Sequence, residues 1–139
     1  MDELQAAILR AKLPHLNAWN ARRREIAQQY HAAFAPLGLR CPFEGAERIH
    51  CYHLYVLRVP QRERFQAILR QKGVQTLIHY PVPVHLQEAY AECRSQGAHL
   101  PCTERGAAEI LSIPLFSELT DEEVNYIITS VIETHEQLA

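Results

Sequence analysis

Several features that would point directly to a function are scarce in this sequence. Its 139 residues include five glycines and no G-x-G-x-x-G or P-loop pattern, which excludes a phosphate-binding loop of either type. No apolar run approaches the roughly 20 residues that a membrane-spanning helix needs. The chain starts with the acidic residues Asp2 and Glu3, whereas a secretory signal starts with basic ones. We therefore expect a cytoplasmic protein that does not enter the membrane.

Strong charge and metal-ligand spacings are missing too. The formal net charge is −2 and the basic residues are dispersed, apart from the run Arg22–Arg24, so we expect no nucleic-acid partner. Histidines and cysteines occur without C-x-x-C, H-x-x-x-H or H-E-x-x-H spacing, so we expect no metal site. Nothing arranges a cysteine and a histidine as a nucleophile with its base, so no catalytic residue is assigned. We expect the four cysteines to be reduced thiols: Cys41, Cys51, Cys93 and Cys102.

A long helical pattern opens the chain. Apolar residues recur at three- and four-residue spacings over residues 2–34, which predicts one long helix or two abutting ones. Asp2 is the expected N-cap, and Pro14 is expected to kink the helix because it lacks an N–H. Such a helix is longer than one small core can cover. We therefore expect it to pack on something outside this chain as well.

The rest of the chain, residues 39–139, forms the predicted α/β core. Strands are predicted where β-branched and aromatic residues gather, over 39–43, 51–59, 74–80 and 111–115. Helices are predicted over 61–71, 86–92, 101–111 and after the capping box that begins at Thr120. The strand–helix–strand order suits a crossover between two strands of one sheet. We predict a single α+β domain over residues 1–139, with a small sheet of about three strands packed against helices.

The most distinctive stretch is VQTLIHYPVPVH at residues 74–85. Its two prolines lack an N–H and fix φ, so they stop the ladder and leave a stiff, irregular arm. The arm carries His79, Tyr80 and His85, whose imidazole and phenol groups can hydrogen-bond a phosphate or a sugar hydroxyl. A proline-stiffened loop that caps the sheet is an equally simple interpretation. The residues alone do not decide between these two.

Four segments, taken in order, resemble the C-terminal part of the DegT/DnrJ/StrS family of sugar aminotransferases. They are MDELQAAILRAKLPHLNAWNARRREIAQQY at 1–30, YHLYVLRVP at 52–60, GVQTLIHYPVPVHLQEAY at 73–90 and ERGAAEILSIPLFSELTDEEVNYII at 104–128. The resemblance implies the small domain of a fold type I enzyme that uses pyridoxal phosphate on nucleotide-linked keto sugars, in polysaccharide or antibiotic-sugar biosynthesis. In relatives a large N-terminal domain holds the cofactor and the Schiff-base lysine, and that domain has no counterpart in these residues.

Carried over by position, the resemblance assigns the arm to substrate. His79 and Tyr80 would approach the sugar or the diphosphate, with His85 in support. The two lysines of the chain, Lys12 and Lys72, match no Schiff-base position of the family. We therefore expect no cofactor-binding residue here, although full-length relatives use pyridoxal phosphate, and we expect no transamination by this chain alone.

Two hypotheses remain after the resemblance. The chain is either an aminotransferase domain whose chemistry needs the missing half, or an autonomous, non-catalytic small protein that binds a nucleotide sugar or a protein partner. In both cases the long helix is expected to expose an apolar strip, and such a strip favours a homodimer. The strip consists of Leu4, Ala7, Ile8 and Ala11.

Overall fold

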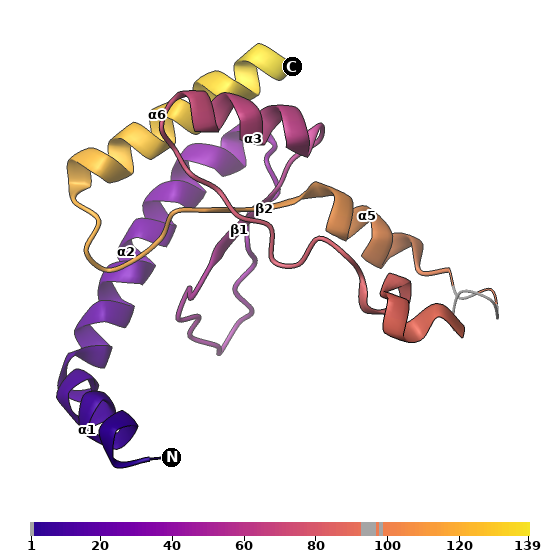
Figure 1. The fold of residues 1–139 in the computed structure, drawn as a ribbon. Helices are drawn as coiled ribbons and strands as arrows, with labels where there is room; N and C mark the ends of the chain where they lie inside the picture. Colours follow the sequence, from indigo (N-terminus) through magenta and orange to yellow (C-terminus); the bar gives the residue numbers. More distant parts are fainter. Residues whose placement is uncertain (1, 93–96, 98) are drawn as a thin grey trace.

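The computed structural model describes residues 2–92, 97 and 99–139. Helices α2, α3 and α6 gather on one side of a two-stranded sheet, and α5 extends from the end of the sheet (Figure 1). In chain order the elements are α1 (Glu3–Lys12), a 3-10 turn (Leu13–His15), α2 (Leu16–Phe34), a 3-10 turn (Ala35–Leu37), β1 (Tyr55–Arg58), α3 (Arg62–Gln71), 3-10 turns (Val84–Leu86 and Glu88–Tyr90), α5 (Pro101–Glu109), β2 (Ile110–Ile113) and α6 (Asp121–Leu138).

The α+β class is confirmed, but the sheet has two strands instead of about three. β1 pairs antiparallel with β2 along all four of its residues. Beyond these strands, the described residues add only single bridges, from Arg40 to Arg58 and from Leu77 to Ser112. The segment after α3 therefore borders β2 and runs parallel to β1, as the predicted strand–helix–strand crossover requires, but it pairs at a single bridge and forms no strand.

The predicted strand over 74–80 fails because its backbone groups are bonded elsewhere. The Val74 N–H donates to the Leu69 carbonyl at the end of α3, at 2.9 Å. The Gln66 side-chain amide donates to the Thr76 carbonyl at 3.0 Å and lies 3.1 Å from the Thr76 hydroxyl. Within this segment Leu77 makes the bridge to β2, and both of its backbone groups bond Ser112.

Other predicted elements are shorter in the structure. The strand expected over 51–59 begins at Tyr55, because the Tyr52 N–H turns inward to the His50 Nδ1 atom at 2.8 Å. The segment 39–43 contributes one bridge and no strand, and 86–92 begins with 3-10 turns. Short-range side-chain contacts thus compete successfully with the ladder.

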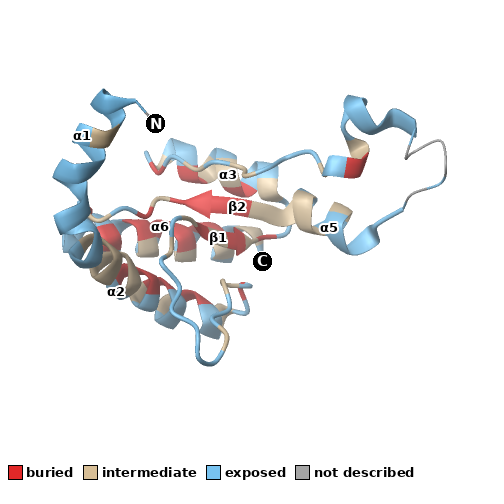
Figure 2. Cartoon of the chain, turned by 90° about the horizontal axis from the view of Figure 1, so that it is seen from below, coloured by how far each residue is buried: buried red, intermediate tan, exposed pale blue. Residues whose placement is uncertain are grey.

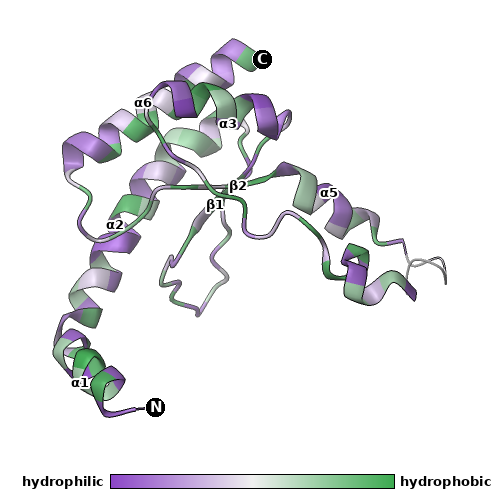
Figure 3. Ribbon diagram, in the orientation of Figure 1, coloured by the Kyte–Doolittle hydropathy of each residue, from purple (hydrophilic) through white to green (hydrophobic). Residues whose placement is uncertain are grey.

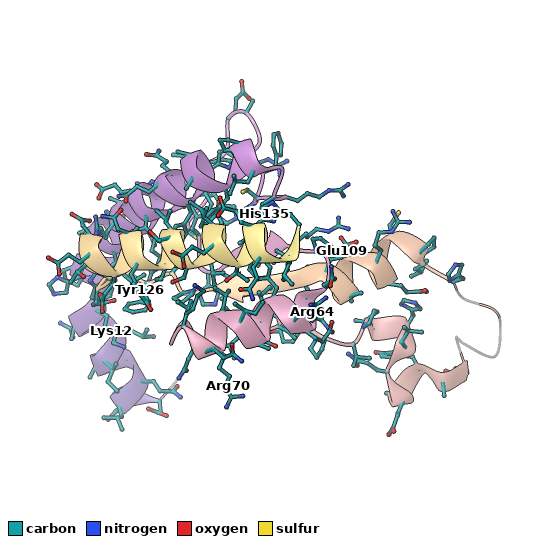
Figure 4. All side chains as sticks on the ribbon, turned by 90° about the horizontal axis from the view of Figure 1, so that it is seen from above. Lys12, Arg64, Arg70, Glu109, Tyr126 and His135 are labelled. Atoms are coloured by element: carbon teal, nitrogen blue, oxygen red, sulfur yellow. The ribbon has the colours of Figure 1, made fainter. Side chains whose placement is uncertain are left out.

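The core lies between the sheet and the three helices. In β1, Tyr55 and Leu57 are buried while the alternating residues are half-buried, as expected when helices cover one face. Tyr30 of α2 sits against this face, with its ring 5.2 Å from that of Tyr55 and its hydroxyl donating to the Pro114 carbonyl at 2.9 Å. In Figure 4, α6 runs alongside α3, and in Figure 2 most of the buried residues, in red, lie on the two strands and on α2, α3 and α6.

Several local predictions are confirmed. The Asp2 carboxylate accepts a hydrogen bond from the Gln5 N–H at 2.8 Å, so it caps α1. A 3-10 turn containing Pro14 interrupts the long helix between α1 and α2. Thr120 and Glu123 form the predicted capping box of α6, each side chain bonding the backbone N–H of the other.

Two further observations concern the described part of the chain. None of its helices combines the length and the apolar character needed to cross a membrane. Cys41, Cys51 and Cys102 are free thiols, and Cys93 lies outside the described residues.

Candidate substrate-binding arm

The three candidate substrate-binding residues, His79, Tyr80 and His85, lie within residues 79–85, which we call the arm. The chain just before the arm is held against β2, where Leu77 donates its N–H to the Ser112 carbonyl (3.0 Å) and accepts from the Ser112 N–H (2.7 Å). Ser112 is the polar residue of an otherwise apolar strand, and it alternates with Leu111 and Ile113 of the core. Its side chain therefore lies on the sheet face away from the helices.

His79 uses this serine as its partner. Its Nδ1 atom lies 3.0 Å from the hydroxyl of Ser112, a residue that is only 5% exposed. The ring of Tyr80 stands perpendicular to that of His79, with centroids 6.0 Å apart, across a cis peptide bond. Tyr80 is 78% exposed, and its hydroxyl has no hydrogen-bond partner among the described residues. The arm thus presents one anchored imidazole and one free phenol.

His85 points elsewhere and is nearly buried. Its Nε2 atom lies 3.0 Å from the Glu104 carboxylate in the first turn of α5. The same carboxylate oxygen accepts from the Leu100 N–H at 2.9 Å and lies 3.2 Å from His99 Nδ1. His85 and Glu104 together fasten the end of the arm to α5. We call this contact the Glu104 clamp.

The clamp has a clear electrostatic consequence. The hydrogen bond from His85, followed by that from the Leu100 N–H, lowers the pKa of the Glu104 carboxyl below its usual range. Both contacts favour the ionised carboxylate. The Glu104 side chain is therefore ionised at neutral pH, so it accepts hydrogen bonds and donates none.

The structure thus separates the three residues predicted to contact substrate. His79 and Tyr80 lie next to each other, whereas His85 is turned toward α5 by the clamp. Between the two ends, Val82 and Val84 are exposed at 47% and 63%. Arm geometry is compatible with contact to substrate by His79 and Tyr80 and with a supporting role for His85.

Two residues that hold the arm were missed in the sequence. Ser112 could have been noticed as the one hydroxyl in the strand ILSI, and Glu104 as an acid in the first turn of a helix. An acid there is usually explained by the helix dipole alone. Nothing in the sequence indicates that the partner of Ser112 lies 33 residues away or that the partner of Glu104 lies 19 residues away.

A hollow lies beside the start of the arm, between α3 and the segment that leads to Leu77. Most of its lining residues have polar side chains, and Gln66 closes one side by bonding Thr76. Arg70, on the exposed face of α3, is the one basic residue in the lining (Figure 4). The remaining lining residues are Glu63, Ala67, Gln71 and Gln75.

Neither lysine of the chain lies at the candidate site. Lys72 has its Nζ atom 2.5 Å from the Glu133 carboxylate and its carbonyl bonded by the Tyr126 hydroxyl. Lys12 is exposed on α1, and neither lysine lines the hollow beside the arm. Within the described ranges, no three histidine, cysteine or acidic side chains come together as metal ligands.

Comparisons with known proteins agree with this architecture. The model of the DegT/DnrJ/EryC1/StrS aminotransferase family matches residues 1–132. A dTDP-3-amino-3,6-dideoxy-alpha-D-galactopyranose transaminase of Aneurinibacillus thermoaerophilus is 40% identical over 94% of this chain, which corresponds to 36% of the transaminase. The chain therefore spans little more than a third of that relative.

Solved structures give the same picture. DesV of S. venezuelae, determined with a ketimine intermediate, superimposes with a TM-score of 0.88 and 35% identity over 98% of this chain and 37% of DesV. NtdA of Bacillus subtilis, determined with the cofactor PMP, gives a TM-score of 0.87 with 28% identity over 99% of this chain and 33% of NtdA. Since the family model covers nearly the whole sequence, this chain belongs to the DegT/DnrJ/EryC1/StrS aminotransferase family.

Proposed function

We propose that this chain is the C-terminal, substrate-facing domain of a pyridoxal-phosphate-dependent aminotransferase that acts on a nucleotide-linked keto sugar. The observation that carries this proposal is the family match over residues 1–132, together with a relative described as a dTDP-sugar transaminase. The chain aligns with about a third of DesV and of NtdA, and NtdA is described with bound PMP. The cofactor chemistry is assigned to the part of such enzymes that these residues do not align with.

In this proposal the arm contacts the substrate. The exposed Tyr80 hydroxyl is free to donate to a diphosphate or a sugar oxygen. His79, oriented by Ser112 through Nδ1, keeps Nε2 for a second contact. His85 supports the arm through the Glu104 clamp. The same anchoring favours binding, because little arm motion remains to be frozen when a ligand arrives.

We further propose that the chain does not transaminate by itself. A catalytic Schiff base needs a lysine amine inside a cofactor site, whereas the Lys72 ammonium is paired with Glu133, Lys12 lies exposed on α1, and neither lines the hollow beside the arm. Mixing the purified chain with pyridoxal phosphate is expected to give no internal-aldimine absorbance. Appearance of that band, and its loss in Lys72→Arg or Lys12→Arg, would contradict this part of the proposal.

Substrate contact is tested by calorimetric titration of the chain with dTDP-glucose and with UDP-N-acetylglucosamine. We expect weak binding that Tyr80→Phe and His79→Ala reduce. Tyr90→Phe and His31→Ala serve as matched controls, because both residues are exposed and lie off the arm. Equal heats for all four variants, or no heat at millimolar ligand, would argue against an arm that contacts nucleotide sugars.

A second function is supported by one observation, which is that the core closes with residues of this chain alone. The buried side chains of the three helices and the sheet pack against one another, so the domain can be stable without another domain. An autonomous, non-catalytic protein that binds a nucleotide sugar or a protein partner would have this property. Pull-down of a separate chain resembling the cofactor domain would instead favour the aminotransferase.

A further inference from the structure

Ser112 is a polar residue inside an apolar part of the sheet. Figure 3 draws much of β2 in the green of hydrophobic residues, and Ser112 is 5% exposed. In the ladder it faces Val56 of β1 on one side and Leu77 on the other. A hydroxyl that water scarcely reaches must find its hydrogen-bond partners within the protein.

The side chains around Ser112 offer its hydroxyl no acceptor. Residues directly opposite each other in antiparallel pairs project from the same face of a sheet, as do residues two apart along a strand. Among the described residues, the Ser112 hydroxyl has one hydrogen-bond partner, which is the His79 Nδ1 atom at 3.0 Å. The neighbours that share its face by these two rules are all apolar: Val56, Leu77 and Ile110.

A contact between a hydroxyl and an imidazole nitrogen can run in either direction. If Nδ1 carried the proton and donated it to Ser112, the serine hydrogen would be buried without an acceptor. If the serine donates instead, its hydrogen and the Nδ1 lone pair are both satisfied. A buried donor without a partner is the costlier arrangement, so the serine donates. The proton of a neutral His79 ring then resides on Nε2.

We propose that Ser112 holds the neutral His79 ring in the tautomer with its proton on Nε2, so that the ring offers a hydrogen-bond donor to the ligand of the arm. Nε2 has no hydrogen-bond partner within the described ranges. A donor there selects an oxygen that carries no proton, such as a phosphate oxygen. Tyr80, whose ring centroid lies 6.0 Å from that of His79, supplies a second donor. Ser112 is a positioning residue, because it acts on the ligand only through His79.

The use of this donor toward a nucleotide sugar rests on the proposed function, whereas the tautomer does not. The tautomer depends on a contact made inside this chain, between Ser112 and His79. Ser112 is already buried by residues of this chain, so a further part of a longer protein that covered the arm would leave the contact in place. The tautomer can therefore be measured with no ligand present.

Nitrogen-15 NMR of the histidine rings tests the tautomer directly. The spectra are recorded at about pH 8.5, where an imidazole is neutral. We expect His79 to show a protonated Nε2 and an unprotonated Nδ1, with the signals assigned through their loss in His79→Ala. His31 is the control, because it is exposed and has no hydrogen-bond partner in the described part of the chain. Its two nitrogens should show the averaged shifts of exchanging tautomers.

Two variants separate the hydroxyl of Ser112 from its size. In Ser112→Ala, which removes the donor, His79 should show averaged shifts as His31 does. In Ser112→Thr, which keeps the hydroxyl, His79 should keep its fixed pattern. In calorimetric titrations with dTDP-glucose, Ser112→Ala should weaken binding by about two- to tenfold, the range for one hydrogen bond, and Ser112→Thr by less than about twofold. Circular dichroism checks that both variants fold.

Several results would overturn this proposal. They are a proton on Nδ1 of His79, averaged shifts in the unchanged chain, or a Ser112→Ala variant in which His79 keeps its fixed pattern. Equal weakening of dTDP-glucose binding in Ser112→Ala and Ser112→Thr would show a packing role and overturn the link to the ligand. A fixed proton on Nε2 without heat from millimolar dTDP-glucose would support the tautomer and count against the proposed function instead.

Discussion

The two helices that open the chain, α1 and α2, carry similar apolar patterns but differ in how far their residues are buried. α2 buries Ile26, Ala27, Tyr30 and Phe34, all in its second half, whereas α1 buries no residue. The difference is the position of each helix relative to the sheet, because the second half of α2 contributes to the core that also contains Tyr55 of β1, whereas α1 lies outside that core. Helical periodicity identifies an apolar face, but it does not say whether the chain itself covers that face.

The sharpest way to test this contrast is to truncate one side chain in each helix. Phe34→Ala should lower the free energy of unfolding by about 3–5 kcal/mol, because Phe34 is fully buried and stacked on Tyr30. Leu4→Ala should cost less than about 0.5 kcal/mol at concentrations where the chain is monomeric. Urea unfolding of both variants measures the difference. Similar losses would mean that α1 is packed in solution.

A smaller effect is expected from one hydroxyl of α2. Tyr30→Phe removes the hydrogen bond to the Pro114 carbonyl and should cost about 0.5–1.5 kcal/mol. Burial also raises the pKa of Tyr30 above its usual value of about 10, so the folded state holds the neutral phenol. Stability should therefore fall as pH rises above about 10, and this fall should be shallower in Tyr30→Phe. An identical alkaline limb in both proteins would show that Tyr30 ionises freely.

The arm offers the same contrast between an anchored part and a projecting part. The lowered pKa of Glu104 means that its contribution to stability is present above about pH 4.3 and lost as pH falls through the lower, folded-state value. Glu104→Gln should therefore remove part of the acid-induced loss of stability and loosen the arm at neutral pH. Hydrogen exchange of the Leu86 and Gln87 amides, followed from pH 3 to pH 7, measures both. Unchanged exchange in the variant would mean that the clamp does not hold the arm.

The smallest effect is predicted for Leu9→Gln. Leu9 is exposed and lies outside the apolar strip, so the change in unfolding free energy should stay within about 0.5 kcal/mol. A thermal unfolding curve compared with that of the unchanged chain is sufficient. A larger loss would indicate that a contact beyond the strip covers this side of α1.

Local rules predicted what local chemistry determines. The cap at Asp2, the interruption at Pro14 and the capping box at Thr120 each depend on residues within one turn, and all three are confirmed. The three-stranded sheet was wrong because Gln66 and Leu69 of α3 claim backbone groups of the segment that follows α3. Competition between elements for backbone hydrogen bonds leaves no periodic pattern in a single sequence, so it could not be predicted.

At the candidate site too, the sequence predicted the local features and missed the contacts between distant residues. The two prolines of the arm predicted a stiff segment, and His79 and Tyr80 lie together on it. The sequence could not separate His85 from them, because its contact is with Glu104 on a helix that follows later in the chain. Contact with substrate by His79, Tyr80 and His85 stays a prediction, and the titrations described above address it.

The single bridge between Leu77 and Ser112 also affects how readily this small sheet pairs with strands of other molecules. An uncovered outer strand can recruit strands from other molecules and seed fibrous aggregates. Here the chain pairs with β2 at one bridge and then continues into the arm, where Pro81 and Pro83 have no N–H to donate to a further strand. The feature that shapes the arm therefore also discourages runaway strand addition, a form of protection that a two-stranded sheet particularly needs.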